Sequence, residues 1–264
     1  MKNRYRYGYS LLVCLLLMRF HLHAQELYVY TDPASTMPAK SIILKQSYLK
    51  MEGIANANWN TQLELSPKKN WMVHIGTNYS ATDLYLQHRF YSSDQVHQHT
   101  RLAWYAKAVS AGATPSTEAI LLDGQQKFWG AGLIATRLQH KWASSMSLGY
   151  LYRYVGNTTF TSQAIQYSLS NGLLLYPVSY KNYNQTNINL YAEILGQKQI
   201  GGTGYYIDIA PAIQFIFHSQ AKLNIGYKWP IVDHMSRLGG RSLYISYDYL
   251  FFNALSRAKK PKMN

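Results

Sequence analysis

The chain has 264 residues, of which 47% are hydrophobic and only 14% are charged, against about 25% charged residues in a typical soluble domain. Mean hydropathy is nevertheless negative, at -0.24, because uncharged polar residues and 24 tyrosines are abundant. This balance is unusual for a cytosolic enzyme and suits a surface between lipid and water. The net charge of +14 raises the question of nucleic-acid binding, but the bases are spread along the chain without a binding motif, so we expect no nucleic-acid partner.

Residues 1–24 have the three parts of a secretory signal peptide. The basic MKNRYRYGYS precedes the apolar LLVCLLLM, which is too short to cross a membrane as a helix, and RFHLHAQ allows cleavage after Ala24. Cys14 is the single cysteine and lies in the apolar part, so the mature chain has no thiol for a disulfide or a metal site. We expect residues 25–39, which contain Pro33 and Pro38, to form a periplasmic or lumenal segment that caps the barrel predicted below.

Residues 40–252 alternate between apolar and polar side chains in twelve segments, which is the period of strands with two different faces. Mostly short connections alternate with longer ones, as in outer-membrane barrels. We therefore predict an all-β fold: a single-chain transmembrane antiparallel β-barrel of about 12 strands, with residues 253–264 as a basic periplasmic tail. The segments begin near Lys40, Asn58, Trp71, Asp83, His97, Phe128, Lys141, Ala164, Gln185, Gly204, Ala221 and Arg241.

A soluble β-sandwich is the alternative fold, since its strands also alternate. The predicted strands are longer than the usual five or six residues, which favours the barrel. An even strand number also places both termini on the periplasmic side. The segment from Phe128 is ambiguous, because both of its faces are small or apolar. Pro211 shares the apolar face of its strand with Ile209 and Ile213, where its missing N–H requires a gap or bulge in the ladder.

The mature start QELYVYTDPASTMPAKS, together with SSDQVHQHTRLA, QTNINLYAEILGQ and YYIDIAPAIQFIF, resembles a family of Bacteroidota outer-membrane β-barrel proteins of unestablished function. That family has an opening similar to ELYVxTEPASNMPAKS, and Asp32 and Thr36 stand here in place of Glu and Asn. The resemblance covers most of the mature chain. That family is loosely similar to a broader group of outer-membrane transport barrels. The resemblance implies a location and a fold, but it implies no site residues.

Polar side chains on the predicted inner face are candidates for the barrel lumen. One interpretation is that opposite charges pair and fill the barrel, since buried charges are rare unless paired. The other is a conducting lumen in which the charges set selectivity. Glu193 and Asp208 lie on sequential strands, so we consider them possible neighbours. The candidates are Glu64, His74, Gln87, Arg89, His99, Arg101, Lys107, Arg153, Glu193, Asp208, Gln214, Lys228 and Asp248.

These observations predict a narrow pore or transport protein for small solutes in the outer membrane of a Gram-negative cell. The alternatives are a non-conducting structural or surface-recognition barrel and, third, a barrel-wall hydrolase, although no spacing of nucleophile and base is recognisable. His97 and His99 share a strand face, but two ligands do not make a metal site. We assign no catalytic residue, metal or cofactor. The expected partners are outer-membrane lipid, the secretion and barrel-assembly machinery, and a small solute or ion.

Overall fold

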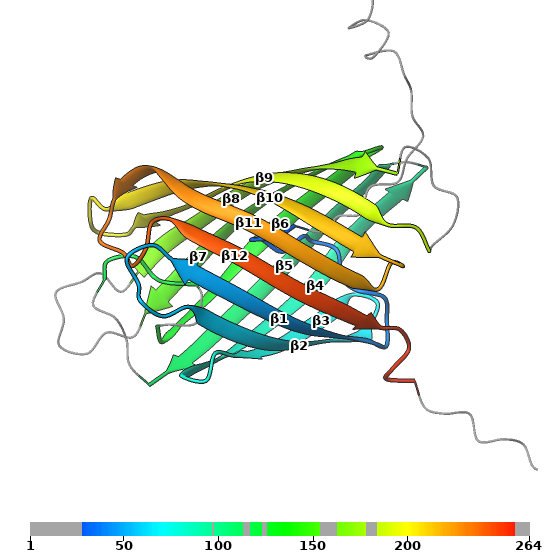
Figure 1. Cartoon of the computed structure of the whole chain (residues 1–264), viewed down its shortest axis with the longest axis horizontal. Coiled ribbons are helices and arrows are strands. Elements are labelled where there is room, and N and C mark those ends of the chain that lie inside the picture. Colours follow the sequence, from blue (N-terminus) through cyan, green and yellow to red (C-terminus); the bar gives the residue numbers. More distant parts are fainter. Residues whose placement is uncertain are drawn as a thin grey trace, which may run out of the picture.

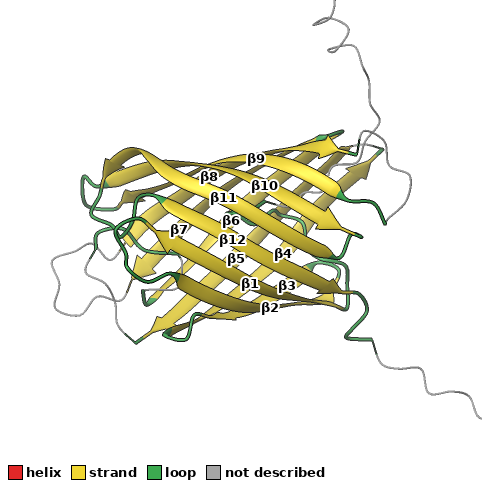
Figure 2. Cartoon of the chain, viewed as in Figure 1, coloured by secondary structure: helices red, strands yellow, loops and turns green. Residues whose placement is uncertain are grey.

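The computed structural model describes residues 28–96, 98–112, 117–122, 126–153, 163–177 and 184–256. Twelve antiparallel strands close into one barrel, in which each strand pairs with its sequence neighbours and the first pairs with the last (Figure 1). Among the described residues, no helix is long and apolar enough to cross a bilayer. Strands and loops make up the whole described chain (Figure 2). The strands are β1 (Ser41–Met51), β2 (Asn58–Lys68), β3 (Trp71–Thr77), β4 (Ala81–Gln95), β5 (Gln98–Ala111), β6 (Phe128–Gln139), β7 (Trp142–Arg153), β8 (Gln163–Tyr176), β9 (Asn187–Gln199), β10 (Tyr205–Phe217), β11 (Ala221–His234) and β12 (Ser242–Phe251).

The predicted fold is confirmed, and the predicted strand starts differ from the observed ones by at most two residues, as at Asp83 and Gln185. Alternating apolar and polar residues form these strands because the two sides of the wall meet different surroundings. The short connections β2–β3, β4–β5, β6–β7 and β10–β11 lie at one end of the barrel, which we call the turn end. The start of β1 and the end of β12 lie there too. The opposite end, the loop end, carries residues 52–57, 117–122 and 235–241.

Large apolar side chains cover the outside of the wall, while polar side chains on its inside are buried. Leu133 is 60% exposed and Leu148 57%, whereas Gln87 and Ser170 are fully buried. This is the reverse of a soluble protein, in which exposed apolar area of this extent is rare. The outer surface is therefore suited to the hydrocarbon of a bilayer.

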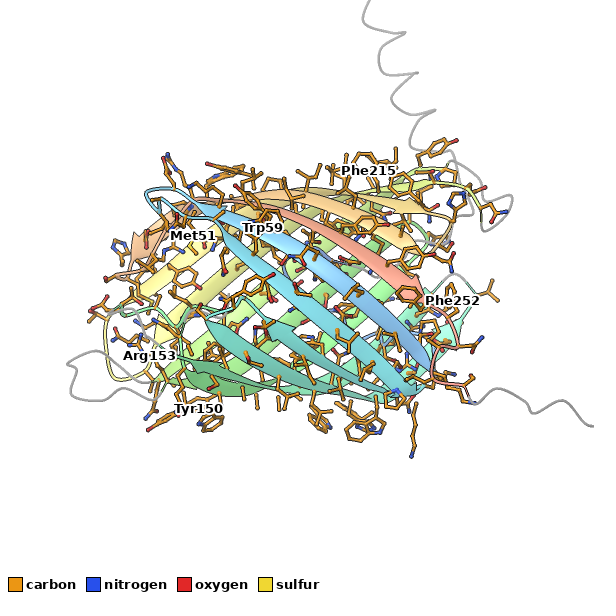
Figure 3. The ribbon with its side chains drawn as sticks, turned by 60° about the horizontal axis from the view of Figure 1, so that its bottom comes forward. Met51, Trp59, Tyr150, Arg153, Phe215 and Phe252 are labelled. Atoms are coloured by element: carbon orange, nitrogen blue, oxygen red, sulfur yellow. The ribbon has the colours of Figure 1, made fainter. Side chains whose placement is uncertain are left out.

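Aromatic side chains gather on the outer surface toward both ends of the barrel. Trp71 and Trp104, toward the turn end, have ring centroids 5.8 Å apart. Trp129 and Tyr150, toward the loop end, have ring centroids 5.9 Å apart. Figure 3 shows Tyr150 and Phe215 projecting away from the wall. Two aromatic bands that border an apolar zone are typical of barrels that span a membrane.

Inside the barrel, tyrosine rings lie over glycines of the neighbouring strand. A side chain at Gly172 would collide with the Tyr191 ring, and one at Gly132 would collide with the Tyr105 ring and the β7 backbone. The glycines of β6 therefore form its inner face, and Trp129 and Leu133 form its outer face. This resolves the ambiguity of that strand, whose small residues make room for tyrosines from the neighbouring wall.

Pro211 lies on the outer face of β10. The register of β10 with β11 runs from Tyr205 to Ile209 and resumes at Ala212, with an irregularity between Ile207 and Asp208. Pro211 stays paired with Ala192 of β9, and its missing N–H coincides with a break in the β10–β11 ladder.

Candidate functional site

Residues 28–40, the lumenal segment, lie inside the barrel and contact its wall on several sides. The Ala34 N–H donates to Thr136 Oγ1 at 2.8 Å, and Gln87 Nε2 donates to the Pro33 carbonyl at 2.9 Å. Arg101 Nη1 donates to Ser35 Oγ at 2.7 Å. Ala34 is fully buried. These contacts join the segment to β4, β5 and β6 through side chains, without adding it to the sheet.

Glu193 of β9 provides the largest set of hydrogen bonds to the lumenal segment. Its Oε1 accepts the N–H groups of Val29 and Tyr30, each at 2.9 Å. Its Oε2 accepts the hydroxyl of Thr31 at 2.7 Å and that of Ser170 at 3.0 Å. Glu193 is 0% exposed. Hydrogen bonds to a carboxylate are about twice as strong as neutral ones, so this residue is the principal anchor of the segment.

A second inward-folded segment, residues 117–122 of the β5–β6 connection, enters from the loop end and is called here the constriction loop. Arg153 Nη1 donates to the Thr117 carbonyl at 2.6 Å, and Lys107 Nζ donates to the Leu122 carbonyl at 3.0 Å. Gln197 Nε2 donates to the Ile120 carbonyl at 2.6 Å and its Oε1 accepts the Ile120 N–H at 3.1 Å. Lumen side chains of three strands therefore satisfy the loop's backbone.

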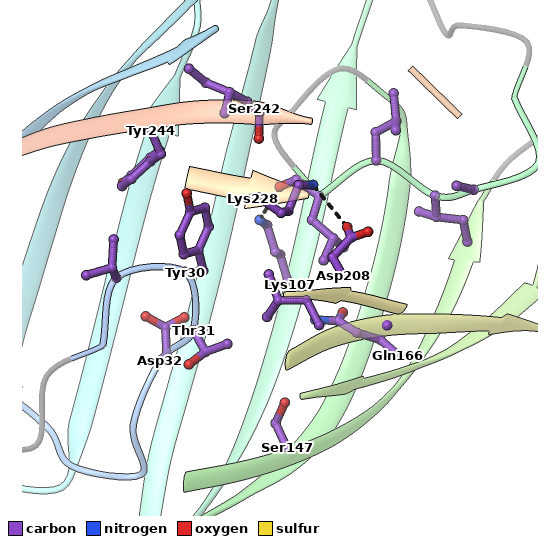
Figure 4. A pocket seen from close by; sticks show the side chains of 18 of the residues that line it. Tyr30, Thr31, Asp32, Lys107, Ser147, Gln166, Asp208, Lys228, Ser242 and Tyr244 are labelled. Carbon is purple, nitrogen blue, oxygen red and sulfur yellow. Dashed lines mark hydrogen bonds and ion pairs between the residues drawn. The ribbon is translucent and has the colours of Figure 1, made fainter. Parts of the chain in front are cut away.

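The two inserted segments border a cavity of about 310 Å³ in the barrel interior (Figure 4). The lumenal segment supplies Tyr30, Thr31 and Asp32 to its lining, and the constriction loop supplies Ala119 to Leu122. The rest of the lining combines aliphatic residues, such as Leu49, Met51 and Leu195, with polar and aromatic ones. It includes Asn58, Asn60, Gln62, Tyr105, Ser147, Gln166, Tyr206 and Tyr244. The volume is at the lower end of the range of about 300–1,000 Å³ that is usual for small-molecule sites.

A cluster of charges lines the cavity near the loop end. Both oxygens of Asp208, on β10, accept hydrogen bonds from Arg237 Nη1 and Nη2 at 2.7 Å, and Lys228 Nζ is 3.5 Å from Asp208. Arg237 also donates from Nε to Asp233 at 2.9 Å and lies over the Tyr206 ring. Burial disfavours the charged guanidinium, but the hydrogen bonds and charges of Asp208 and Asp233 outweigh it, so the pKa of Arg237 lies above its ordinary value.

The strand register places every predicted lumen candidate on the inward face, but their surroundings differ. Asp83 pairs with His74 at 3.1 Å, and Asp248 pairs with Lys222 at 3.2 Å. Arg89 donates to the Lys69 carbonyl, and Gln214 donates to Asn224. Glu64 is half-buried and lies opposite His74 of β3.

Glu193 and Asp208 share a face, but the register sets Glu193 opposite Ala210 and Asp208 opposite Leu195. They bind different partners and do not form one acidic site. Four charged lumen residues were missed from the sequence. Lys45, Asp83 and Lys222 follow the same alternation and were predictable from it. Arg237 lies in a loop, where no periodicity marks a side chain as inward.

His97 of the HQH motif lies outside the described residues. His99 Nδ1 is 3.0 Å from Asp94 Oδ1, which also accepts from Arg101 Nη2 at 3.2 Å. Within the described ranges, no group of three potential metal ligands occurs. The His74 and His99 rings each contact an aspartate there, and neither contacts a serine or threonine hydroxyl.

No known family model matches the chain, and no curated protein matches its sequence. Among solved structures, an outer membrane channel from Pseudomonas putida F1 has a TM-score of 0.52 and 11% identity, over 85% of this chain and 100% of that chain. KdgM porin has a TM-score of 0.47 and 8% identity, over 79% of this chain and 99% of its own. NanC porin has a TM-score of 0.46 and 10% identity, over 79% and 98%. At these identities the similarity concerns the fold alone, a closed antiparallel β-barrel.

Proposed function

We propose that this protein is an outer-membrane channel for small solutes, and that the conformation described here is its closed state. The outer apolar zone between aromatic bands supports insertion in a bilayer, with outer-membrane lipid and the barrel-assembly machinery as partners. The motifs of the mature start support membership of the Bacteroidota barrel family, and the N-terminal pattern supports export with a cleaved signal peptide.

The observation that carries this proposal is how the lumen is filled. A closed barrel satisfies its own backbone hydrogen bonds and needs no insert to do so. Apart from Lys40, whose backbone N–H donates to the Ser66 carbonyl, the lumenal segment joins the wall through side chains. Its withdrawal therefore leaves all twelve inter-strand ladders intact. A cavity with both polar and apolar lining already lies between this segment and the constriction loop. A removable insert beside a lumenal cavity is the arrangement of a gated channel.

A non-conducting barrel is the second candidate, because several lumen charges are paired and the segment occupies the interior. In a channel the lumenal segment leaves the lumen, whereas in a non-conducting barrel it stays there. The full mature chain, refolded and inserted in planar bilayers, tests this. We compare the wild type with Val29→Pro/Thr31→Val, which removes two of the three donors to Glu193 that belong to the segment.

The matched control is Val29→Ala/Thr31→Ser, which keeps both donors. We expect brief unitary currents from the wild type and the control, and longer openings from the proline variant. No unitary current from the wild type or the proline variant at any salt concentration contradicts the channel and favours the non-conducting barrel.

A further inference from the structure

Glu193 differs from the paired carboxylates of the lumen in the partners that it has. Asp83, Asp208 and Asp248 each lie within 3.5 Å of a histidine, lysine or arginine. Glu193 is equally buried, but all its partners are neutral: two backbone N–H groups and two hydroxyls. Over the part of the chain that the structure describes, no ion pair includes it. A buried carboxylate without a counter-ion is a site that favours a cation.

Three of the four donors belong to the removable segment. When residues 29–31 withdraw, Glu193 keeps Ser170 alone among these partners. A cation with N–H groups restores the lost hydrogen bonds and adds the opposite charge that the segment lacks. An anion is repelled at this position, and a neutral donor only equals what the segment already provides. Competition for Glu193 therefore selects a cation.

The cavity leads to this site and has matching chemistry. Val29, Tyr30 and Thr31 line the cavity and donate to Glu193, so they separate the two. Tyrosines 30, 85, 105, 167, 206 and 244 surround the cavity, and aromatic faces attract ammonium and guanidinium groups. The Asp32 carboxylate also faces it (Figure 4). The cavity's own bases are engaged: Lys107 with the Leu122 carbonyl, and Arg237 and Lys228 with Asp208.

We propose that the solute of this channel is a small organic cation with N–H donors, and that it binds Glu193 by displacing residues 29–31. This inference rests on the channel function proposed above and adds the chemical class of the solute that the channel carries. It makes Glu193 a binding residue of the open state and the anchor of the lumenal segment in the closed state. The segment is then a built-in competitor of the solute.

The test measures release of the segment in the full mature chain, which has no cysteine of its own if the signal peptide is removed. Ala34→Cys places a thiol at a fully buried position of the segment, away from Glu193. We measure its alkylation rate by iodoacetamide in detergent micelles, with methylammonium chloride as the probe. Tetramethylammonium chloride at equal ionic strength is the control, since it has the same charge without N–H donors.

We expect methylammonium to raise the alkylation rate about 3- to 10-fold, which corresponds to the net contribution of one typical hydrogen bond, about 0.7–1.4 kcal/mol. Tetramethylammonium should have little effect. Adding Glu193→Gln should raise the rate roughly tenfold without any probe, because the charge assistance is lost, and should abolish the response. Adding Asp248→Asn, which neutralises a carboxylate that has its own base, should leave the methylammonium response intact.

The proposal is wrong if methylammonium leaves the rate unchanged, if tetramethylammonium acts equally, or if the response persists in Glu193→Gln. Bilayer currents report separately on the channel. A response without current contradicts channel function but supports the Glu193 site, whereas current without a response contradicts the solute class alone.

Discussion

Replacing Arg237 with methionine should destabilise the barrel and loosen its constriction. Asp208 is 0% exposed and accepts two hydrogen bonds of 2.7 Å from Arg237. Methionine leaves it with Lys228 at 3.5 Å as its ion-pair partner. Breaking a buried pair by removing one partner costs about 3–5 kcal/mol. The contact of Arg237 with Asp233, whose side chain is 38% exposed, adds little to this figure.

Urea unfolding in detergent micelles, followed by the heat-modifiable shift on gels, measures this loss of stability. The double variant Asp208→Asn/Arg237→Met removes both charges, so it should cost about 1–3 kcal/mol less than the sum of the two single variants. Ser236 accepts from the backbone of Glu118 and Ala119, so the Arg237 loop also holds the constriction loop. Currents of Arg237→Met should therefore be larger. A cost below about 1 kcal/mol, or strict additivity, refutes the buried clamp.

Two further predictions test the lumen packing and the lipid face. Gly172→Val should cost about 1–3 kcal/mol, because the new side chain collides with the buried Tyr191 ring. Gly112→Val, whose Cβ would meet only the Ser80 carbonyl at 4.0 Å, should change the urea midpoint little. Equal effects of the two substitutions contradict the packing. Leu169→Arg, on the outer face in the middle of β8, should cost about 2–4 kcal/mol in lipid vesicles, and Leu175→Arg near the turn end at most about 1 kcal/mol. A cost that does not depend on depth contradicts the bilayer position.

The strands were predictable because lipid and lumen impose opposite requirements on alternate residues. Asp208 and Gln214 looked out of place among isoleucines, yet the inward face of β10 buries both of them. The same alternation predicts that Glu193 and Lys228 point inward, and this prediction needs no comparison with homologous sequences. Strand starts were accurate because turn residues interrupt the alternation sharply.

The interior was less predictable, because its contacts join residues that are far apart in the sequence. Val29 and Glu193 are separated by 164 positions, and no local pattern connects them. From the sequence, the N-terminal segment could lie either in the periplasm or in the lumen. The structure shows residues from Tyr28 onward in the lumen. The inward fold of the constriction loop and the role of Arg237 also depend on three-dimensional contacts that have no period.

A reversible lock on the lumenal segment tests the gated channel most directly. Thr31 Oγ1 and Ser170 Oγ are 2.7 Å apart, so cysteines in both positions lie within reach of a disulfide. Oxidised Thr31→Cys/Ser170→Cys should hold the segment in the lumen and suppress unitary currents in planar bilayers, and a reductant added to the same membrane should restore them. The single variants should not respond to the reductant. Equal currents from the oxidised and reduced double variant would contradict the claim that residues 28–40 close this barrel.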